Sequence, residues 1–183
     1  MLNLKDPEHT NTRWNILLIM VLFASIMGLP SSGNASEAKT SPHLQRAKIF
    51  LAATDYRRAI EACQRHLEAY PSVEAYVYLT YVYHALEGYL EHLAKRDEWV
   101  KIGYVSISLA TRGMFDLVDP PNIMPRMARE MIHEGVRQQS DVTASMANQL
   151  DKNRTDELWA QQTAWREANP DRWWAGVPEA WDW

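Results

Sequence analysis

Residues 42 to 71 constrain the fold of this chain most strongly, because they contain the full pattern of two short helices and the turn between them. Ser41 and Pro42 are typical of a helix start, where serine caps free backbone N–H groups and proline fits the first turn. Apolar residues then recur at spacings of three and four, which gives a helix one apolar face. These residues are Leu44, Ala47, Phe50 and Leu51.

A second helix is predicted directly after the first. Thr54 and Asp55 are expected to turn the chain and cap this helix, which runs from Tyr56 to about Ala69 and ends before Pro71. Its predicted buried stripe consists of Ala59, Ile60, Cys63 and Leu67. Its predicted solvated face consists of Arg57, Arg58, Glu61, Gln64, Arg65 and Glu68. Together the two helices predict an antiparallel hairpin.

This hairpin resembles a tetratricopeptide repeat (TPR), a unit of about 34 residues built from two antiparallel helices. The residues that carry the resemblance are Ala47, Phe50, Asp55, Tyr56, Ala59, Leu67 and Pro71. The step from His43 to Tyr76 is also about one repeat long. The resemblance implies an all-α fold for residues 42–169, with TPR-like hairpins in a short α-solenoid and additional C-terminal helices.

The next segment contains strand-favouring residues, but its longer pattern is helical. Tyrosine and valine dominate residues 76–83, and such residues are enriched in strands. Apolar residues nevertheless continue at helical spacing over several turns, at Leu79, Val82, Tyr83, Leu86, Leu90 and Leu93. We expect one or two helices from Val73 to about Lys95, with Gly88 at a bend or at the turn of a degenerate second repeat. His92 stands there at a position where the repeat family has a small residue.

Two more helices are expected before residue 150. Residues 99–103 look like another repeat start, either by coincidence or as a divergent repeat, and Asp119-Pro120-Pro121 ends this helix. Its predicted buried side is Val100, Tyr104, Ile107, Met114 and Val118. Pro125 begins the next helix, with a predicted stripe of Met124, Met127, Ala128, Met131, Ile132 and Val136. Val142, Met146 and Leu150 either extend this helix or follow a break near Ser140.

The C-terminal region is rich in tryptophan. Thr155 is expected to cap a helix from Asp156 to about Asn169, and residues 170–183 form a tail. Six of the eight tryptophans lie here, at positions 159, 165, 173, 174, 181 and 183. Our first interpretation is that the tail packs back on the helices and closes the core, because large aromatic rings bury much area. The alternatives are a docking segment for a partner, a platform for sugar rings and, least favoured without a Lys/Arg-rich face, a membrane-interface anchor.

The N-terminal region has the layout of a secretory signal peptide. Lys5 and Arg13 precede an uncharged apolar run at residues 16–29, and Gly33-Asn34-Ala35 provides a small-residue cleavage site. We therefore expect a signal peptide over residues 1–35 and a flexible lead over residues 36–41. The expected location is periplasmic or secreted. The alternative is an uncleaved N-terminal anchor that holds the protein on the exported side of a membrane.

Charge and cysteine content exclude other classes. The formal net charge is −4 and no basic block occurs, whereas nucleic-acid binding needs a dense Lys/Arg surface. The only cysteine, Cys63, cannot form an internal disulfide. We expect it to behave as a small buried apolar residue.

No catalytic motif stands out, so the sequence predicts neither an enzyme nor a cofactor. It contains no Gly-rich phosphate loop, Gly-x-Ser-x-Gly elbow, His-Glu-x-x-His zinc motif or Cys-x-x-Cys-His haem motif. The nearest metal-ligand pattern is His84, Glu87 and Glu91, with His92 beside them. We interpret these residues as a polar helix edge and predict no metal site, because ligands are expected to converge from more than one helix.

The leading functional prediction is a non-catalytic adaptor, scaffold or assembly factor that binds another protein or peptide segment in a short helical groove. Groove residues implied by the TPR resemblance are Leu44, Lys48 and Leu51 from the first repeat and Glu74, Val77, Tyr81 and His84 from the second. If His84 is exposed, it would make the contact sensitive to pH near 6.5.

Two other possibilities follow from the tryptophans. A ligand-binding or glycan-binding accessory domain of an envelope enzyme system would use the tail and the tyrosine-rich helix to enclose a small molecule or sugar. The groove is expected to be short, because only one complete hairpin is present. We therefore expect either a dedicated contact with one partner or occupation of the groove by the tail itself, in place of a long peptide-binding surface.

Overall fold

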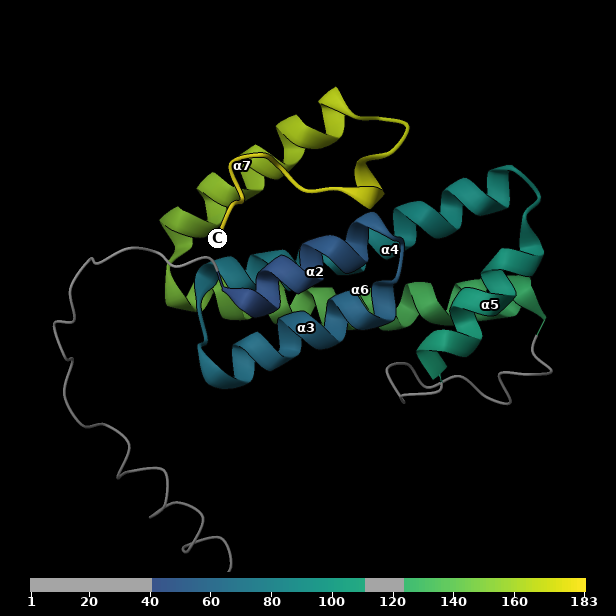
Figure 1. Cartoon of the computed structure of the whole chain (residues 1–183), viewed down its shortest axis with the longest axis horizontal. Coiled ribbons are helices and arrows are strands. Elements are labelled where there is room, and N and C mark those ends of the chain that lie inside the picture. The colour runs from purple at the N-terminus through teal and green to yellow at the C-terminus, as the bar shows by residue number, and fades with distance from the viewer. Residues whose placement is uncertain (1–40, 111–123) are drawn as a thin grey trace, which may run out of the picture. The chain divides into compact units, whose positions relative to one another are not determined.

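A computed structural model describes residues 41–110 and 124–183, all of which belong to one compact unit, Ala38–Trp183. The described residues contain six α-helices and no strand, so the all-α prediction is confirmed for them (Figure 1). The elements are α2 (Pro42–Ala52), α3 (Tyr56–Ala69), α4 (Val73–Lys95), α5 (Trp99–Ala110), α6 (Pro125–Leu150), α7 (Lys152–Ala168) and the 3-10 helix η1 (Trp173–Ala175). The predicted signal peptide, Met114 and Val118 lie outside the described residues.

The first two helices form the predicted hairpin with the predicted caps. The Ser41 Oγ accepts the backbone N–H of Leu44 at 3.4 Å, and the Asp55 carboxylate accepts that of Arg58 at 3.1 Å. Cys63 is fully buried and free, and burial raises the pKa of its thiol. The prediction of a buried cysteine is therefore confirmed. The buried residues of the hairpin are Leu44, Ala47, Leu51, Tyr56, Ala59, Ile60, Ala62, Cys63 and His66.

Helix α4 is a single helix of 23 residues, of which 13 are buried. It contacts α3, α5, α6, α7 and η1. All of its buried residues except Thr80 are apolar, as expected for a helix that packs on several sides. Gly88 lies inside this helix and does not mark a bend or a turn, which corrects that prediction. Its role is close packing, because a Cβ atom at Gly88 would lie 2.5 Å from the Cζ2 atom of Trp173.

The predicted buried face of α5 is wrong for its described residues, and that of α6 is confirmed at Ala128, Ile132 and Val136, with Met131 partly buried. In α5, Val100 and Tyr104 are 71% and 70% exposed, and the buried residues are Ile102, Ser106 and Leu109.

Helix α6 continues without a break through Ser140. Its buried residues are Ala128, Ile132, Val136, Ser140, Thr143 and Ala147, whereas Met124, Met127, Val142, Met146 and Leu150 are exposed. Apolar residues occur on both sides of each helix, so spacing alone does not identify the packed side.

Helix α7 begins earlier than predicted. Asp151 is its N-cap and accepts the backbone N–H of Arg154 at 3.0 Å. Thr155 is fully buried inside the helix, where its hydroxyl donates to the Asp151 carbonyl at 2.7 Å. A threonine can use its hydroxyl in this way within a helix, so it is no reliable marker of a helix start.

After α7 the chain reverses and the tail runs back between α7 and the layer that contains α2 and α4 (Figure 1). The tail is held by hydrogen bonds to residues of α3, α4 and α7. Among the helices of the two described ranges, none is both long enough and apolar enough to span a membrane.

Candidate partner-binding groove

The seven predicted groove residues lie on α2 and α4, but most of them are covered. Leu44, Leu51, Val77 and Tyr81 are buried, and Lys48, Glu74 and His84 are partly exposed. Helices α2 and α4 both contact η1, and α4 also contacts α7. The protein's own C-terminal part therefore covers much of the surface that the sequence predicted for a partner.

Two tyrosine hydroxyls hold the backbone of the tail. The Tyr81 hydroxyl lies 2.7 Å from the carbonyl oxygens of both Trp173 and Gly176, and it donates its single hydrogen to this pair. The Tyr56 hydroxyl donates to the Trp174 carbonyl at 3.0 Å. These two hydroxyl hydrogens, one of them shared, provide hydrogen-bond partners for tail carbonyls that lose water on packing.

Trp181 is the most deeply buried tryptophan of the tail. It is 1% exposed, and its ring centroid lies 5.8 Å from that of Tyr78 and 5.3 Å from that of Tyr81. Its indole Nε1 donates to the Gln161 Oε1 atom at 3.1 Å. Trp181 thus joins α4 to α7 through apolar contact and one hydrogen bond.

Trp173 packs into the space above Gly88. Its ring lies edge-on to Tyr81, with a centroid distance of 5.9 Å, and the Arg166 guanidinium lies 4.1 Å from the Trp173 ring centroid. Both Trp173 and Trp181 are buried, so the structure agrees with the interpretation that the tail packs on the helices. The same burial leaves neither ring free to form an exposed platform for sugars.

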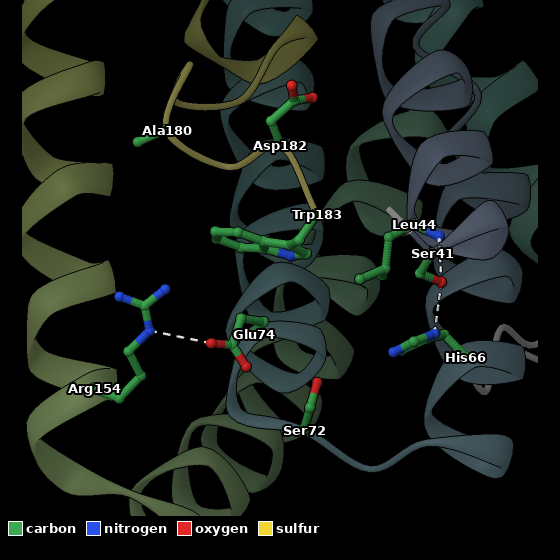
Figure 2. Close-up of a pocket in the computed structure, with 9 residues that line it drawn as sticks. All are labelled: Ser41, Leu44, His66, Ser72, Glu74, Arg154, Ala180, Asp182 and Trp183. Atoms are coloured by element: carbon green, nitrogen blue, oxygen red, sulfur yellow. Dashed lines mark hydrogen bonds and ion pairs between the residues drawn. The ribbon is translucent and has the colours of Figure 1, made fainter. Parts of the chain in front are cut away.

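An open pocket of about 540 Å³ lies where the end of the tail meets α2, α3, α4 and α7 (Figure 2). Leu44 and Glu74 are the predicted groove residues that line it. The other lining residues are Ser41, His66, Ser72, Arg154, Ala180, Asp182 and Trp183. A volume of this size is in the range of small-ligand or short peptide sites.

One wall of the pocket is an ion pair. The Arg154 Nε atom lies 3.1 Å from Glu74, and a second guanidinium nitrogen lies 2.7 Å from Glu157. These carboxylates raise the pKa of Arg154. In Figure 2 the indole of Trp183, which also lines the pocket, lies above this pair. The pocket thus combines an aromatic surface with charges of both signs.

The opposite wall contains a serine–histidine pair in which His66 is buried. The Ser41 Oγ lies 2.7 Å from the His66 Nδ1, and His66 is 8% exposed. Burial, with a smaller contribution from His43, lowers the pKa of His66. The Ser41 hydroxyl, which also accepts the backbone N–H of Leu44, shares this hydrogen bond with the His66 Nδ1 atom. The other ring nitrogen of His66, Nε2, is directed toward the pocket (Figure 2).

His66 was missed in the sequence as a site residue. The available signal was its position three residues after Cys63, on the buried face of the same helix.

Glu87 and Glu91 of α4, which the sequence placed in a possible metal-ligand pattern with His84, have a different partner in the structure. Glu87 and Glu91 bond His133 of α6, at 2.9 Å and 3.1 Å. Within residues 41–110 and 124–183, no group of three potential ligands is arranged for a metal ion.

His84 is only partly exposed, and its ring centroid lies 6.1 Å from that of Trp159. Burial is the main cause that lowers its pKa. Any protonation of His84 in the folded protein therefore occurs below the pH predicted for an exposed side chain.

Comparison of the chain with protein-family models, with characterised proteins and with solved structures gives no match. The likeness to tetratricopeptide repeats therefore stays a prediction from the sequence.

Proposed function

We propose that this protein is a non-catalytic interaction module of TPR-like hairpins, which binds a segment of a partner protein in the groove between α2, α4 and α7. The observation that carries the proposal is that the C-terminal tail, residues 170–183, lies in this groove. Hydroxyl groups bond its backbone, and aromatic side chains contact its tryptophans. These are the two components of peptide recognition, main-chain hydrogen bonds and side-chain pockets.

The open pocket is the proposed entry point for the partner. It borders the last residues of the tail, and the Trp183 ring and Leu44 give it apolar surface. Hot spots of protein interfaces are rich in tryptophan and arginine, and both residue types line this pocket. A partner segment can therefore make its first contact here without any movement of the buried rings.

Selection of short peptides from a displayed random library on the full-length protein tests this proposal. We expect enriched peptides to bind Trp183→Ala at least about tenfold more weakly, because an aromatic anchor contributes 1–3 kcal/mol or more to such contacts. Trp99→Ala is the matched control, since Trp99 is also partly exposed but lies on α5, outside the pocket. Failure to enrich any peptide, or equal loss of binding in both variants, contradicts the proposal.

We also propose that the module acts in an exported compartment, on the basis of residues 1–35. N-terminal sequencing of the protein purified from its native cells tests this point. The expected first residue is Ser36, after cleavage behind Ala35. A chain that keeps residues 1–35 and is found in the cytosol contradicts export.

A further inference from the structure

The tail defines the chemistry of the partner more closely. We infer that residues 170–183 are an internal occupant of the groove, and that the partner is a segment of tail-like chemistry which takes the tail's place. The inference rests on the proposed function. It requires that the groove recognises features which a second segment can reproduce, and three such features are present.

The first feature is a notch for one tryptophan. Gly88 leaves space on α4, and the Trp173 ring fills it so closely that a Cβ at Gly88 would lie 2.5 Å from Cζ2. Three atoms of this ring lie within about 3 Å of the Cβ position, at 2.5, 3.0 and 3.1 Å. The notch therefore accepts an indole only while residue 88 has no side chain.

The second feature is the spacing of a small residue after that tryptophan. Gly176 passes Trp165 of α7 closely, because a Cβ at Gly176 would lie 2.9 Å from the Trp165 Cζ2 atom. Gly176 also provides one of the carbonyls that accept from Tyr81. A competing segment thus needs a tryptophan followed three residues later by glycine.

The third feature is recognition of backbone instead of side chains. Tyr81 and Tyr56 bond carbonyl oxygens, which any peptide presents. Trp181 then fills the second ring site between α4 and α7. Two ring sites and a glycine position specify the segment, and the carbonyl contacts bind it at the 3-10 helix η1 and at Gly176 directly after it.

Exchange is expected to begin at the end of the tail beside the pocket. Asp182 is held there by an ion pair with Lys48 at 3.4 Å, and their side chains are 76% and 40% exposed. Exposed ion pairs of this kind contribute little to stability. Asp182 can therefore leave Lys48 while Trp173 and the buried Trp181 are still bound, and a competitor has to displace Trp181 next.

The test measures binding of a fluorescent synthetic peptide with the sequence of residues 170–183 to the full-length protein. Trp173→Ala weakens the attached tail but leaves the groove intact. We expect the peptide to bind this variant at least about tenfold more tightly than the wild type, because the attached tail then occupies the groove less often. A peptide in which alanine replaces the tryptophan at position 173 is expected to lose this gain.

Two glycine variants in the Trp173→Ala background locate the bound peptide. Gly88→Ala fills the notch and is expected to weaken peptide binding at least about tenfold. Gly103→Ala is the matched control, because its Cβ would lie 3.9 Å from the nearest atom, Pro125 Cγ, which is ordinary contact. If Trp173→Ala loses its helical circular dichroism signal, Trp173→Leu serves in the same design.

Equal binding to wild type and Trp173→Ala, absence of binding to both, or equal effects of the two glycine variants would overturn the inference. Its failure is distinguishable from failure of the proposed function. Library peptides that depend on Trp183, together with a tail peptide that binds no variant, leave the interaction module standing and reject the tail as its internal occupant.

Discussion

Thr54 has a backbone conformation that is unfavourable for its residue type. Its φ angle is 56°, in the left-handed region, at the turn between α2 and α3. A β-branched residue there is strained, whereas glycine adopts this conformation freely. We expect Thr54→Gly to increase the free energy of unfolding by about 1 kcal/mol, measured by urea denaturation.

The matched control is Thr163→Gly, at an exposed position inside α7. There glycine is expected to lower the free energy of unfolding by roughly 0.5 kcal/mol, because it is a poorer helix former than threonine. A loss of stability in both variants would contradict strain at Thr54.

His133 is expected to make stability depend on pH. Its ring lies between Glu87 and Glu91, and its pKa is raised, chiefly by the Glu87 hydrogen bond. Below a pH of about 6.5, the pKa in the unfolded chain, the charged ring contributes fully to the free energy of unfolding. This contribution is lost as the pH rises through the higher pKa of the folded protein. Arg129 also faces this cluster, 3.7 Å from Glu91.

The opposite behaviour is expected of His66 and His84, whose pKa values burial lowers. The neutral rings of these two residues contribute to the free energy of unfolding above about pH 6.5, and this contribution is lost as the pH falls through their lowered pKa values. Comparison of wild type with His133→Gln isolates the His133 contribution, measured as unfolding free energy from pH 5 to pH 9. We expect the difference between the two proteins to shrink as pH rises, and a constant difference would contradict the pairing.

Residues with local roles could be predicted from the sequence, and residues with distant partners could not. Ser41 and Asp55 were assigned as caps because a cap bonds the N–H group three residues later. Gly88 was misinterpreted because its partner is Trp173, far along the chain. His66 was missed for the same reason, since its partner Ser41 belongs to another helix end.

Individual helices show which periodic patterns are ambiguous. Helix α6 buries Ser140 and Thr143 instead of Val142 and Met146. Both buried hydroxyls donate to carbonyls of their own helix, and the Thr143 hydroxyl also lies 2.6 Å from that of Thr80 on α4. Small hydroxyl residues with satisfied hydrogen bonds can occupy a helix interface, so an apolar stripe on the sequence is no unique guide to it.

The assignment of the α6 faces leads to a direct comparison of two variants. Ile132 is fully buried, and we expect Ile132→Ala to lower the free energy of unfolding by about 2–5 kcal/mol. Val142 is 58% exposed. Val142→Ala is expected to change the free energy of unfolding by less than about 0.5 kcal/mol. Urea denaturation measures both values. A larger loss from Val142→Ala than from Ile132→Ala would reverse the assignment.

At the scale of the whole molecule, the sequence predicted the helical class and the first hairpin, but not how the hairpin is completed. Stacked repeats usually need three or more units to bury a continuous core. Here α6 packs on α4, and α7 and the tail cover the surface of α2 and α4. Local patterns do not contain these long-range choices, and the tail's position was only one of several interpretations of its tryptophans.

The central claim is that the tail occupies the groove, and truncation after Asn169 tests it most directly. Removal of residues 170–183 takes away Trp173, Val177 and Trp181 and exposes the aromatic surface beneath them. We expect the melting temperature to fall by more than about 5 °C and the binding of an apolar fluorescent dye to increase. Asp182→Ala removes only an exposed ion pair and is expected to change the melting temperature by less than about 1 °C. A truncated protein that melts like the full-length chain and binds no additional dye would contradict the claim.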